Sequence, residues 1–259
     1  MIYTDYILSG AITGYLVGLT GVGGGALMTP ILLIFFGISP GTAIATDLWF
    51  AAITKLFGAK VHHANGNVDW KVAKRLWLGS LPVAMAVVAV VSAGAQVTKI
   101  GWLTKAIGAV VLLTAVGLLI APKLADYARG RRLGQPERFK TIQPQLTVIS
   151  GAILGVCVAL TSVGAGVLGS VMLLCLYPLR MTPHRLVATD IVHAIPLAVV
   201  AGLGYLVAGL VDWWMLASLL IGSIPAVLLG SVTTGKISGR WIQIALAVIL
   251  SLAGLKILI

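Results

Sequence analysis

Eight long apolar segments, separated by short polar stretches, cover most of the chain. They run approximately over residues 6–37, 41–61, 71–93, 101–121, 146–177, 183–206, 213–232 and 241–259. A helix needs about 20 apolar residues to cross a bilayer. Most of the segments have about that length, whereas 6–37 and 146–177 are each too long for one straight crossing. This pattern predicts an all-α integral membrane protein.

The composition supports this class of protein. The chain is 59% hydrophobic and only 10% charged, and its mean hydropathy is +1.06, which excludes a soluble globular domain with a polar surface. The 18 Lys and Arg residues against 7 Asp and Glu residues are typical either of nucleic-acid binding or of the cytoplasmic loops of a membrane protein. The apolar segments favour the second interpretation.

The long polar stretch at 122–145 divides the segments into two sets of four and contains six basic residues. We therefore expect a first membrane repeat over 1–121, a basic cytoplasmic linker over 122–145 and a second membrane repeat over 146–259. Short motifs recur in the same order in both halves, as in a duplicated transporter unit. The matched stretches are Ser9–Ile12 with Ser150–Ile153, Thr20–Gly25 with Thr161–Gly166, Ala45–Leu48 with Ala188–Ile191, Val68–Trp70 with Val211–Trp213, and Gly79–Pro82 with Gly222–Pro225.

The distribution of basic residues favours a particular topology. If all eight segments cross the membrane, at most 12 of the 18 Lys and Arg residues lie on the cytoplasmic side. If 6–37 and 146–177 are re-entrant hairpins, 15 of them lie there, which fits the positive-inside rule better. Each half then has three crossings, an odd number, so the halves insert with opposite orientations. We expect an inverted repeat of two four-segment halves, each a re-entrant broken hairpin plus three transmembrane helices.

Both long segments are interrupted in the middle by glycine, with TGVGGG in the first and TSVGAG in the second. Unwound backbone inside a bilayer is tolerated only where protein or a water-filled cavity surrounds it. The half-helix that follows such a break presents free N–H groups at the positive end of its dipole, which favours an anion. The alternative is that these glycines serve only helix packing, the role we assign to Gly10, Gly14 and Gly18. The proposed anion-binding residues are Thr20, Gly21, Val22, Gly23, Gly24 and Gly25, with Thr161, Ser162, Val163, Gly164, Ala165 and Gly166 in the second half.

Ionisable residues within apolar segments are costly and point to function. Asp47 and Asp190 each lie seven residues after a proline. Each carboxylate either pins the backbone of the adjacent glycine break or exchanges a coupling proton. His193 lies one helical turn after Asp190, where it either shares that proton or is a buried neutral packing residue. The preceding Thr46 and Thr189 are added to the substrate-binding residues.

Other polar residues are given structural roles. Lys55 is expected to extend its ammonium group to the lipid headgroups. Asp69 and Asp212, each followed by Trp, are expected to cap helices. The histidines outside the helix centres lack the neighbours of a metal site, so no metal and no cofactor are expected. The remaining acidic residues lie near loops or termini, which does not favour an enzyme.

Several of these motifs together resemble a known family. The pattern G-x3-G-x3-G-x2-TGVGGG-x4-P at 10–30, ATDL and ATDI, HAIPL at 193–197, VDW in both halves and GSIP at 222–225 are similar to those of the TauE/SafE sulfite and organosulfonate exporters. The resemblance covers almost the whole chain. It implies a multi-pass transporter of the cell inner membrane that exports sulfite, sulfoacetate or a related sulfonate, with the two glycine breaks as the anion cradle.

The resulting hypothesis is a secondary transporter that works by alternating access and is driven by the anion gradient or by protons passing Asp47 or Asp190. One alternative is an anion channel with the same re-entrant cradle. Another is a noncatalytic membrane assembly partner that uses Gly10, Gly14 and Gly18 for helix contact. The expected partners are a small anionic substrate and membrane lipid, with no nucleic acid. A homodimer is compatible with the sequence.

Overall fold

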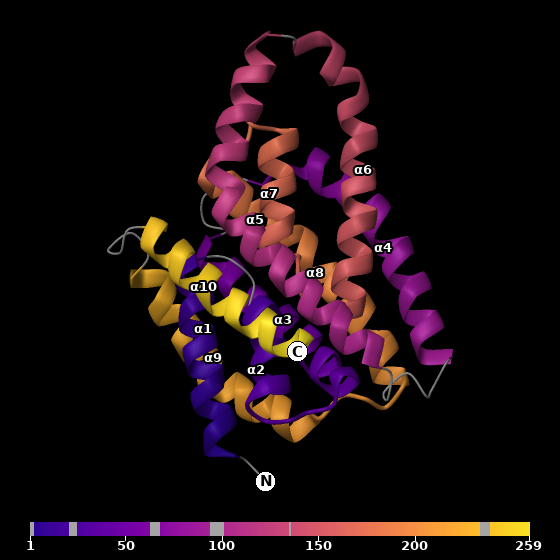
Figure 1. Ribbon diagram of the computed structural model, residues 1–259, viewed down its shortest axis with the longest axis vertical. Helices are drawn as coiled ribbons and strands as arrows, with labels where there is room; N and C mark the ends of the chain where they lie inside the picture. The colour runs from indigo at the N-terminus through magenta and orange to yellow at the C-terminus, as the bar shows by residue number, and fades with distance from the viewer. Residues whose placement is uncertain (1–2, 21–24, 63–67, 94–100, 135, 234–238) are drawn as a thin grey trace.

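A computed structural model of the chain describes residues 3–20, 25–62, 68–93, 101–134, 136–233 and 239–259 (Figure 1). The regular elements in these ranges are all helices, so the predicted all-α class is confirmed. They are α1 (Thr4–Thr20), α2 (Gly25–Ile34), α3 (Pro40–His62), α4 (Trp70–Ala93), α5 (Gly101–Gly134), α6 (Pro136–Thr161), α7 (Val167–Leu176), α8 (Pro183–Val207), α9 (Trp213–Thr233) and α10 (Gly239–Leu258).

The helices follow the predicted apolar segments closely. Each long first segment forms two helices, α1 and α2 in the first half and α6 and α7 in the second, and every other segment forms one. In the described ranges, five helical stretches are long and apolar enough to cross a bilayer. These are Trp70–Val91, Trp102–Gly130, Thr141–Thr161, His184–Val207 and Trp213–Thr233.

Most of the predicted linker is helical. Helix α5 continues to Gly134 and α6 begins at Pro136, so the basic stretch at 122–145 extends two membrane-length helices. Figure 1 shows the joined ends of these helices projecting beyond the rest of the bundle. Charged side chains there are exposed, as in the Asp126–Arg129 ion pair at 3.9 Å. A polar helix of this kind is compatible with water rather than with lipid.

The helices of the two halves interleave. Helix α1 packs along α9, and α6 packs along α4. Small residues allow the backbones to approach closely: Gly10 lies against Leu219, and Gly151 lies against Leu76. The other stripe residues, Gly14 and Gly18, also face α9. The packing role predicted for this stripe is confirmed, and the contacts lie within one chain.

Most helix pairings recur with the halves exchanged. The contact of α2 with α10 corresponds to the contact of α7 with α5. In the same way, the contact of α3 with α9 corresponds to the contact of α8 with α4. Helices α3 and α8 pack against each other, as do α5 and α10. Since α3 and α8 carry Asp47 and Asp190, this arrangement brings the two intramembrane carboxyl groups into the same central region.

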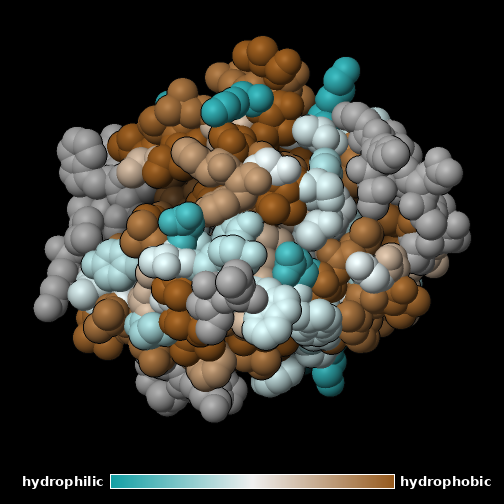
Figure 2. All heavy atoms as spheres, turned by 90° about the horizontal axis from the view of Figure 1, so that it is seen from below, coloured by the Kyte–Doolittle hydropathy of each residue, from teal (hydrophilic) through white to brown (hydrophobic). Residues whose placement is uncertain are grey.

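The outer surface is strongly apolar. Large hydrophobic side chains such as Phe35, Val207 and Val232 are more than 70% exposed. Figure 2 shows hydrophobic residues covering most of the described surface at one end of the molecule, with more hydrophilic residues gathered across its middle. So many exposed large hydrophobic side chains are suited to contact with lipid.

Candidate functional site

The second glycine break is present in the structure. Helix α6 ends at Thr161 and α7 begins at Val167, so residues 162–166 leave the helical path as predicted. Two of them have positive φ, Ser162 at 58° and Gly164 at 118°. Glycine adopts such angles easily, whereas serine adopts them at a cost of about 1 kcal/mol or more. The corresponding residue of the first half is Gly21.

The hydroxyl groups at this break differ in their bonding. The Thr161 hydroxyl donates to the carbonyl oxygen of Cys157 at 2.6 Å and accepts from the Val163 amide at 3.1 Å. It therefore holds the end of α6 in place. The Ser162 hydroxyl is buried and has no hydrogen-bond partner among the described residues. It is the hydroxyl at this break that remains available to a ligand.

The first break is described only at its edges. Thr20 is the last residue of α1 and Gly25 is the first residue of α2. The predicted cradle residues 21–24 lie outside the described residues. The contribution of the first half to the anion cradle stays a prediction.

Asp47 connects α3 to the half-helix that follows the first break. One of its carboxylate oxygens, Oδ2, accepts hydrogen bonds from the Thr29 amide at 3.2 Å and from the Thr29 hydroxyl. Thr29 belongs to α2, and Asp47 is fully buried. The Ser162 hydroxyl lies beside this carboxyl group but outside hydrogen-bonding geometry. These contacts support the pinning role for Asp47 and do not test the coupling role.

Asp190 has a different partner. Its Oδ2 lies 3.5 Å from Nζ of Lys55, and the two side chains are only 2% and 4% exposed. The prediction that Lys55 reaches the lipid headgroups is wrong. Lys55 lies on the face of α3 that packs against α8, and its counter-ion is there. The other oxygen of Asp190, Oδ1, sits against the Cα of Gly169 in α7, where an added Cβ would come within 2.6 Å of it.

His193 contacts α4. Its Nε2 lies 3.0 Å from the Ser80 hydroxyl, and its carbonyl oxygen accepts from the Trp77 indole at 3.2 Å. The ring is fully buried, and Nδ1 has no partner among the described residues. The contacts found for His193 support the packing alternative. Proton sharing with Asp190 stays a prediction.

Thr46 and Thr189 lie where one half meets the other. The Thr46 hydroxyl accepts from the Asp212 amide at 3.3 Å, and the Thr189 hydroxyl accepts from the Asp69 amide at 3.0 Å. Neither threonine lines the cavity described below. Their predicted contact with substrate stays untested, and their observed bonds join the two repeats.

The capping roles of Asp69 and Asp212 are confirmed. Asp69 accepts from the Val72 amide at 3.4 Å at the start of α4, and Asp212 accepts from the Met215 amide at 2.9 Å at the start of α9. A side-chain acceptor at this position satisfies a free N–H of the first helical turn.

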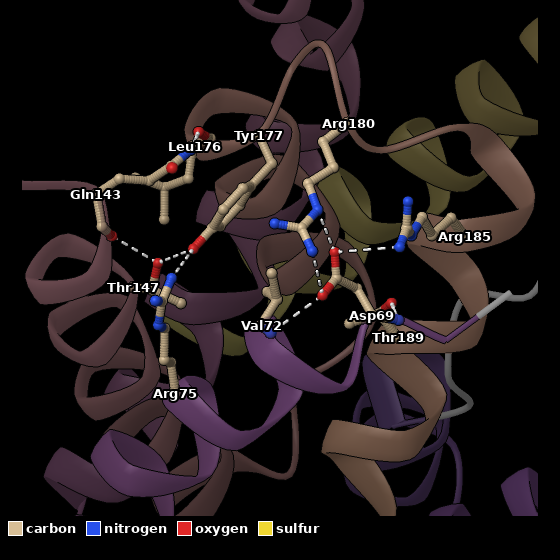
Figure 3. A network of polar contacts seen from close by, with 10 residues as sticks. All are labelled: Asp69, Val72, Arg75, Gln143, Thr147, Leu176, Tyr177, Arg180, Arg185 and Thr189. Atoms are coloured by element: carbon tan, nitrogen blue, oxygen red, sulfur yellow. Dashed lines mark hydrogen bonds and ion pairs between the residues drawn. The ribbon is translucent and has the colours of Figure 1, made fainter. Parts of the chain in front are cut away.

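Asp69 also has a second set of contacts that the sequence did not predict. Both of its oxygens contact the Arg180 guanidinium, at 2.6 Å and 3.0 Å, and Arg185 lies 3.6 Å away (Figure 3). Two-pronged pairing of this kind is the strongest arrangement for arginine and carboxylate. It fixes the chain between α7 and α8 to the start of α4.

A neighbouring group of hydrogen bonds holds the end of α7. Tyr177 shares a 2.7 Å hydrogen bond with the Thr147 hydroxyl, and Arg75 donates to the Tyr177 hydroxyl at 3.4 Å (Figure 3). The Gln143 amide donates to the carbonyl oxygen of Leu176 at 2.6 Å. Helices α4, α6 and α7 are thus joined at one end, so the half-helix α7 is held at its C-terminus while its N-terminus faces the cavity.

A cavity lies at the break between α6 and α7. It is a small space that is partly open to the surface. Helix α3 contributes residues on one face, α8 contributes residues on the facing side, and the non-helical residues form part of the wall. The lining residues are Leu48, Ala51, Lys55, Val158, Ser162, Gly164, Ala165, Gly166, Ala194 and Ala198. The cavity therefore combines part of the predicted cradle with a buried ammonium group.

The architecture and the site define a class of protein. Apolar helices of membrane length surround a broken helix, and the break opens on a mostly apolar cavity to which Lys55 and Ser162 contribute polar side chains. Irregular backbone at membrane depth occurs where protein or a cavity surrounds it. This is the construction of a multi-pass membrane protein, and the cavity at the break is its candidate binding site.

Comparison with known proteins identifies the family. The profile of the sulfite exporter TauE/SafE family matches residues 6–257, and the chain belongs to this family. The probable membrane transporter protein YjnA of Bacillus subtilis is 36% identical over 258 residues, covering 97% of this chain and 98% of that protein.

More distant relatives have the same description. The probable membrane transporter protein YdhB of Bacillus subtilis is 26% identical over 95% of this chain and 96% of its own length. A probable membrane transporter protein of Xylella fastidiosa is 26% identical over 89% of this chain and 84% of its own length. No solved structure matches the chain. The resemblance noted in the sequence is confirmed, and the chain is a multi-pass membrane protein of a transporter family.

Proposed function

We propose that this protein is a secondary transporter of the cell inner membrane that exports small sulfur-containing anions, such as sulfite or sulfoacetate, by alternating access. The observation that carries the proposal is the broken helix at 162–166, which borders a cavity in a chain of the TauE/SafE family. The first turn of α7 supplies N–H donors and a positive dipole end, and Ser162 supplies a hydroxyl.

The exchange of helix partners supports an inverted repeat. Most contacts between helices of different halves have a counterpart with the halves exchanged, and the hydrogen bonds of the two cap residues, Asp69 and Asp212, follow the same rule. Transporters built from inverted repeats alternate between two states by moving one part against the other around a central site. In this proposal α3 and α8, which meet at the cavity, are the helices between which that movement takes place.

The re-entrant arrangement makes a prediction about residue 179. If the hairpins are re-entrant, the chain between α7 and α8 lies on the same side of the membrane as the basic linker. If α6 instead crosses the membrane, that part of the chain lies on the opposite side. Thr141–Thr161 has the length for a crossing, so this arrangement needs a direct test. Leu179 is 63% exposed and suits a labelled cysteine.

The test uses a membrane-impermeant maleimide on sealed vesicles of known orientation, with the native cysteines replaced by serine. We expect Leu179→Cys and Gly130→Cys to be labelled from the cytoplasmic side and Ser39→Cys from the outer side. Gly130→Cys and Ser39→Cys have the same expected sides in both topologies and serve as controls. Labelling of Leu179→Cys from the outer side would contradict the re-entrant arrangement.

The transport proposal is tested with purified protein in proteoliposomes. We expect saturable flux of labelled sulfite or sulfoacetate that exceeds the flux in protein-free vesicles, and competition between the two anions because they share one site. An imposed proton gradient accelerates the flux if protons pass Asp47 or Asp190. Single-channel currents in a planar bilayer would favour an anion channel, and the absence of sulfur-anion flux would contradict the proposed substrates.

A further inference from the structure

The Lys55–Asp190 pair is buried at the centre of the bundle and is incompletely bonded. Lys55 is 4% exposed, and its Nζ lies 3.5 Å from Asp190 without forming a hydrogen bond to any described residue. An ammonium group has three N–H donors, and leaving buried donors unused is costly. A charge kept under these conditions inside a membrane protein points to a ligand or a transport pathway.

The position of Lys55 gives its ammonium group access to the candidate cradle. Lys55, Ser162 and Gly166 line the same cavity, so a cation, an unpaired hydroxyl and the start of α7 border one space. Position 162 is a serine although its φ is positive, an angle that glycine would adopt without strain. All three groups donate hydrogen bonds to negative charge.

Comparison of the two halves indicates that the lysine is not needed to hold a carboxylate. Asp47, the counterpart of Asp190, is held by the amide and hydroxyl of Thr29. The counterpart of Lys55, eight residues after Asp190, is Ala198, which also lines the cavity. Among the described residues, Asp47 is therefore held without a cation, whereas Asp190 of the second half is paired with a lysine that the first half supplies at the cavity.

We propose that Lys55 supplies the positive charge of the anion site and that Asp190 is its internal counter-ion, which a bound oxyanion displaces. This inference rests on the proposed function and names the residue that selects for charge. The bound group is a small oxyanion, sulfite or the sulfonate of a short organic acid. In an organic sulfonate, the carbon attached to sulfur faces Leu48 and Ala194.

The two carboxyl groups set a condition on binding. Asp190 contacts Lys55, and Asp47 borders the site beside Ser162. An anion enters favourably only when it replaces Asp190 on the ammonium group, because three negative charges around one cation repel one another.

The experiment measures binding and flux on the same set of purified variants. Binding is read from the thermal shift produced by sulfite, sulfoacetate, sulfate, thiosulfate, acetate and chloride, since a ligand of the native state raises its stability. Flux is read in proteoliposomes. The variants are Lys55→Gln, Lys55→Arg, Asp190→Asn and the double variant Lys55→Gln/Asp190→Asn. Lys256→Gln, at an exposed lysine near the end of α10, is the control.

We expect Lys55→Gln to weaken anion binding by about tenfold to a hundredfold, the loss of a charge-assisted contact. Lys55→Arg keeps part of the affinity, and Asp190→Asn binds the anion more tightly because the internal competitor is gone. The double variant is the decisive one, because it leaves no unpaired buried charge that would unfold the protein. We expect it to lose affinity for the anion as well. Lys256→Gln behaves as the unaltered protein does.

The results that contradict the role of Lys55 differ from those that contradict the proposed function. A double variant that binds and transports sulfite as the unaltered protein does overturns the role of Lys55 and leaves the proposed function standing. Binding of acetate or chloride alone, lost in Lys55→Gln, supports the lysine site and overturns the sulfur-anion substrates. Absence of binding by any anion in the panel overturns both.

Discussion

Gly79→Ala and Gly222→Ala should each destabilise the folded protein by about 3 kcal/mol, because a methyl group at either position overpacks a helix contact that cannot widen. The added Cβ of Gly79 would overlap the carbonyl oxygen of Val148 in α6, and that of Gly222 would overlap the carbonyl oxygen of Ile7 in α1. The obstructing atoms belong to backbone, so no side chain can rotate away. Thermal unfolding of the detergent-solubilised protein measures the effect.

Gly117→Ala is the matched control for these variants. Gly117 is a glycine of α5 in the same apolar environment, and its added Cβ would lie 3.6 Å from Leu168, an ordinary contact. We expect its unfolding temperature to match or slightly exceed that of the unaltered protein, since alanine favours a helix more than glycine does. Equal stability of Gly79→Ala and Gly117→Ala would contradict the close approach of α4 and α6.

Gly164→Ala should reduce sulfite flux by about tenfold or more while the protein still folds. Its φ of 118° strains any residue with a Cβ by about 1–3 kcal/mol, and the added atom would lie 3.3 Å from Leu168. Relief of this strain moves the wall of the cavity, and each 1.4 kcal/mol lost from anion binding is a tenfold loss of affinity. Flux in proteoliposomes and unfolding temperature are measured together.

The control is Gly209→Ala, which places the same kind of strain elsewhere. Gly209 has a φ of 70° after the end of α8, and nothing lies within 4 Å of an added Cβ. We expect a small loss of stability and unchanged flux. Equal loss of flux in the two variants would show that backbone strain in general, and not the cavity wall, is responsible.

The sequence predicted the helices well because their signals are local. The length of an apolar run sets a membrane helix, and glycine marks the place where α6 gives way to α7 at Thr161. The caps at Asp69 and Asp212 were also predicted, since a cap depends on the residues directly after it. The helices within 122–145 were not predicted, because a polar segment without hydrophobic periodicity gives no signal for a helix.

The site was predicted in part. The break around Ser162 and Gly164 came from composition, but the pairing of Lys55 with Asp190 depends on how α3 crosses α8. The two residues are far apart in sequence, and one sequence alone gives no information about where two helices cross. The Asp69–Arg180 pair was missed for the same reason. The sequence did contain one signal for Lys55, a charge eight residues after Asp47 where the second repeat has Ala198.

The pairing of α1 with α9 has a consequence for biogenesis. The glycine face of α1 is synthesised well before the surface that it contacts, around Leu219 and Ser223. During synthesis of the helices between them, α1 therefore lacks the neighbour that it has in the folded protein. The packing of the first repeat is completed only after α9 has been made.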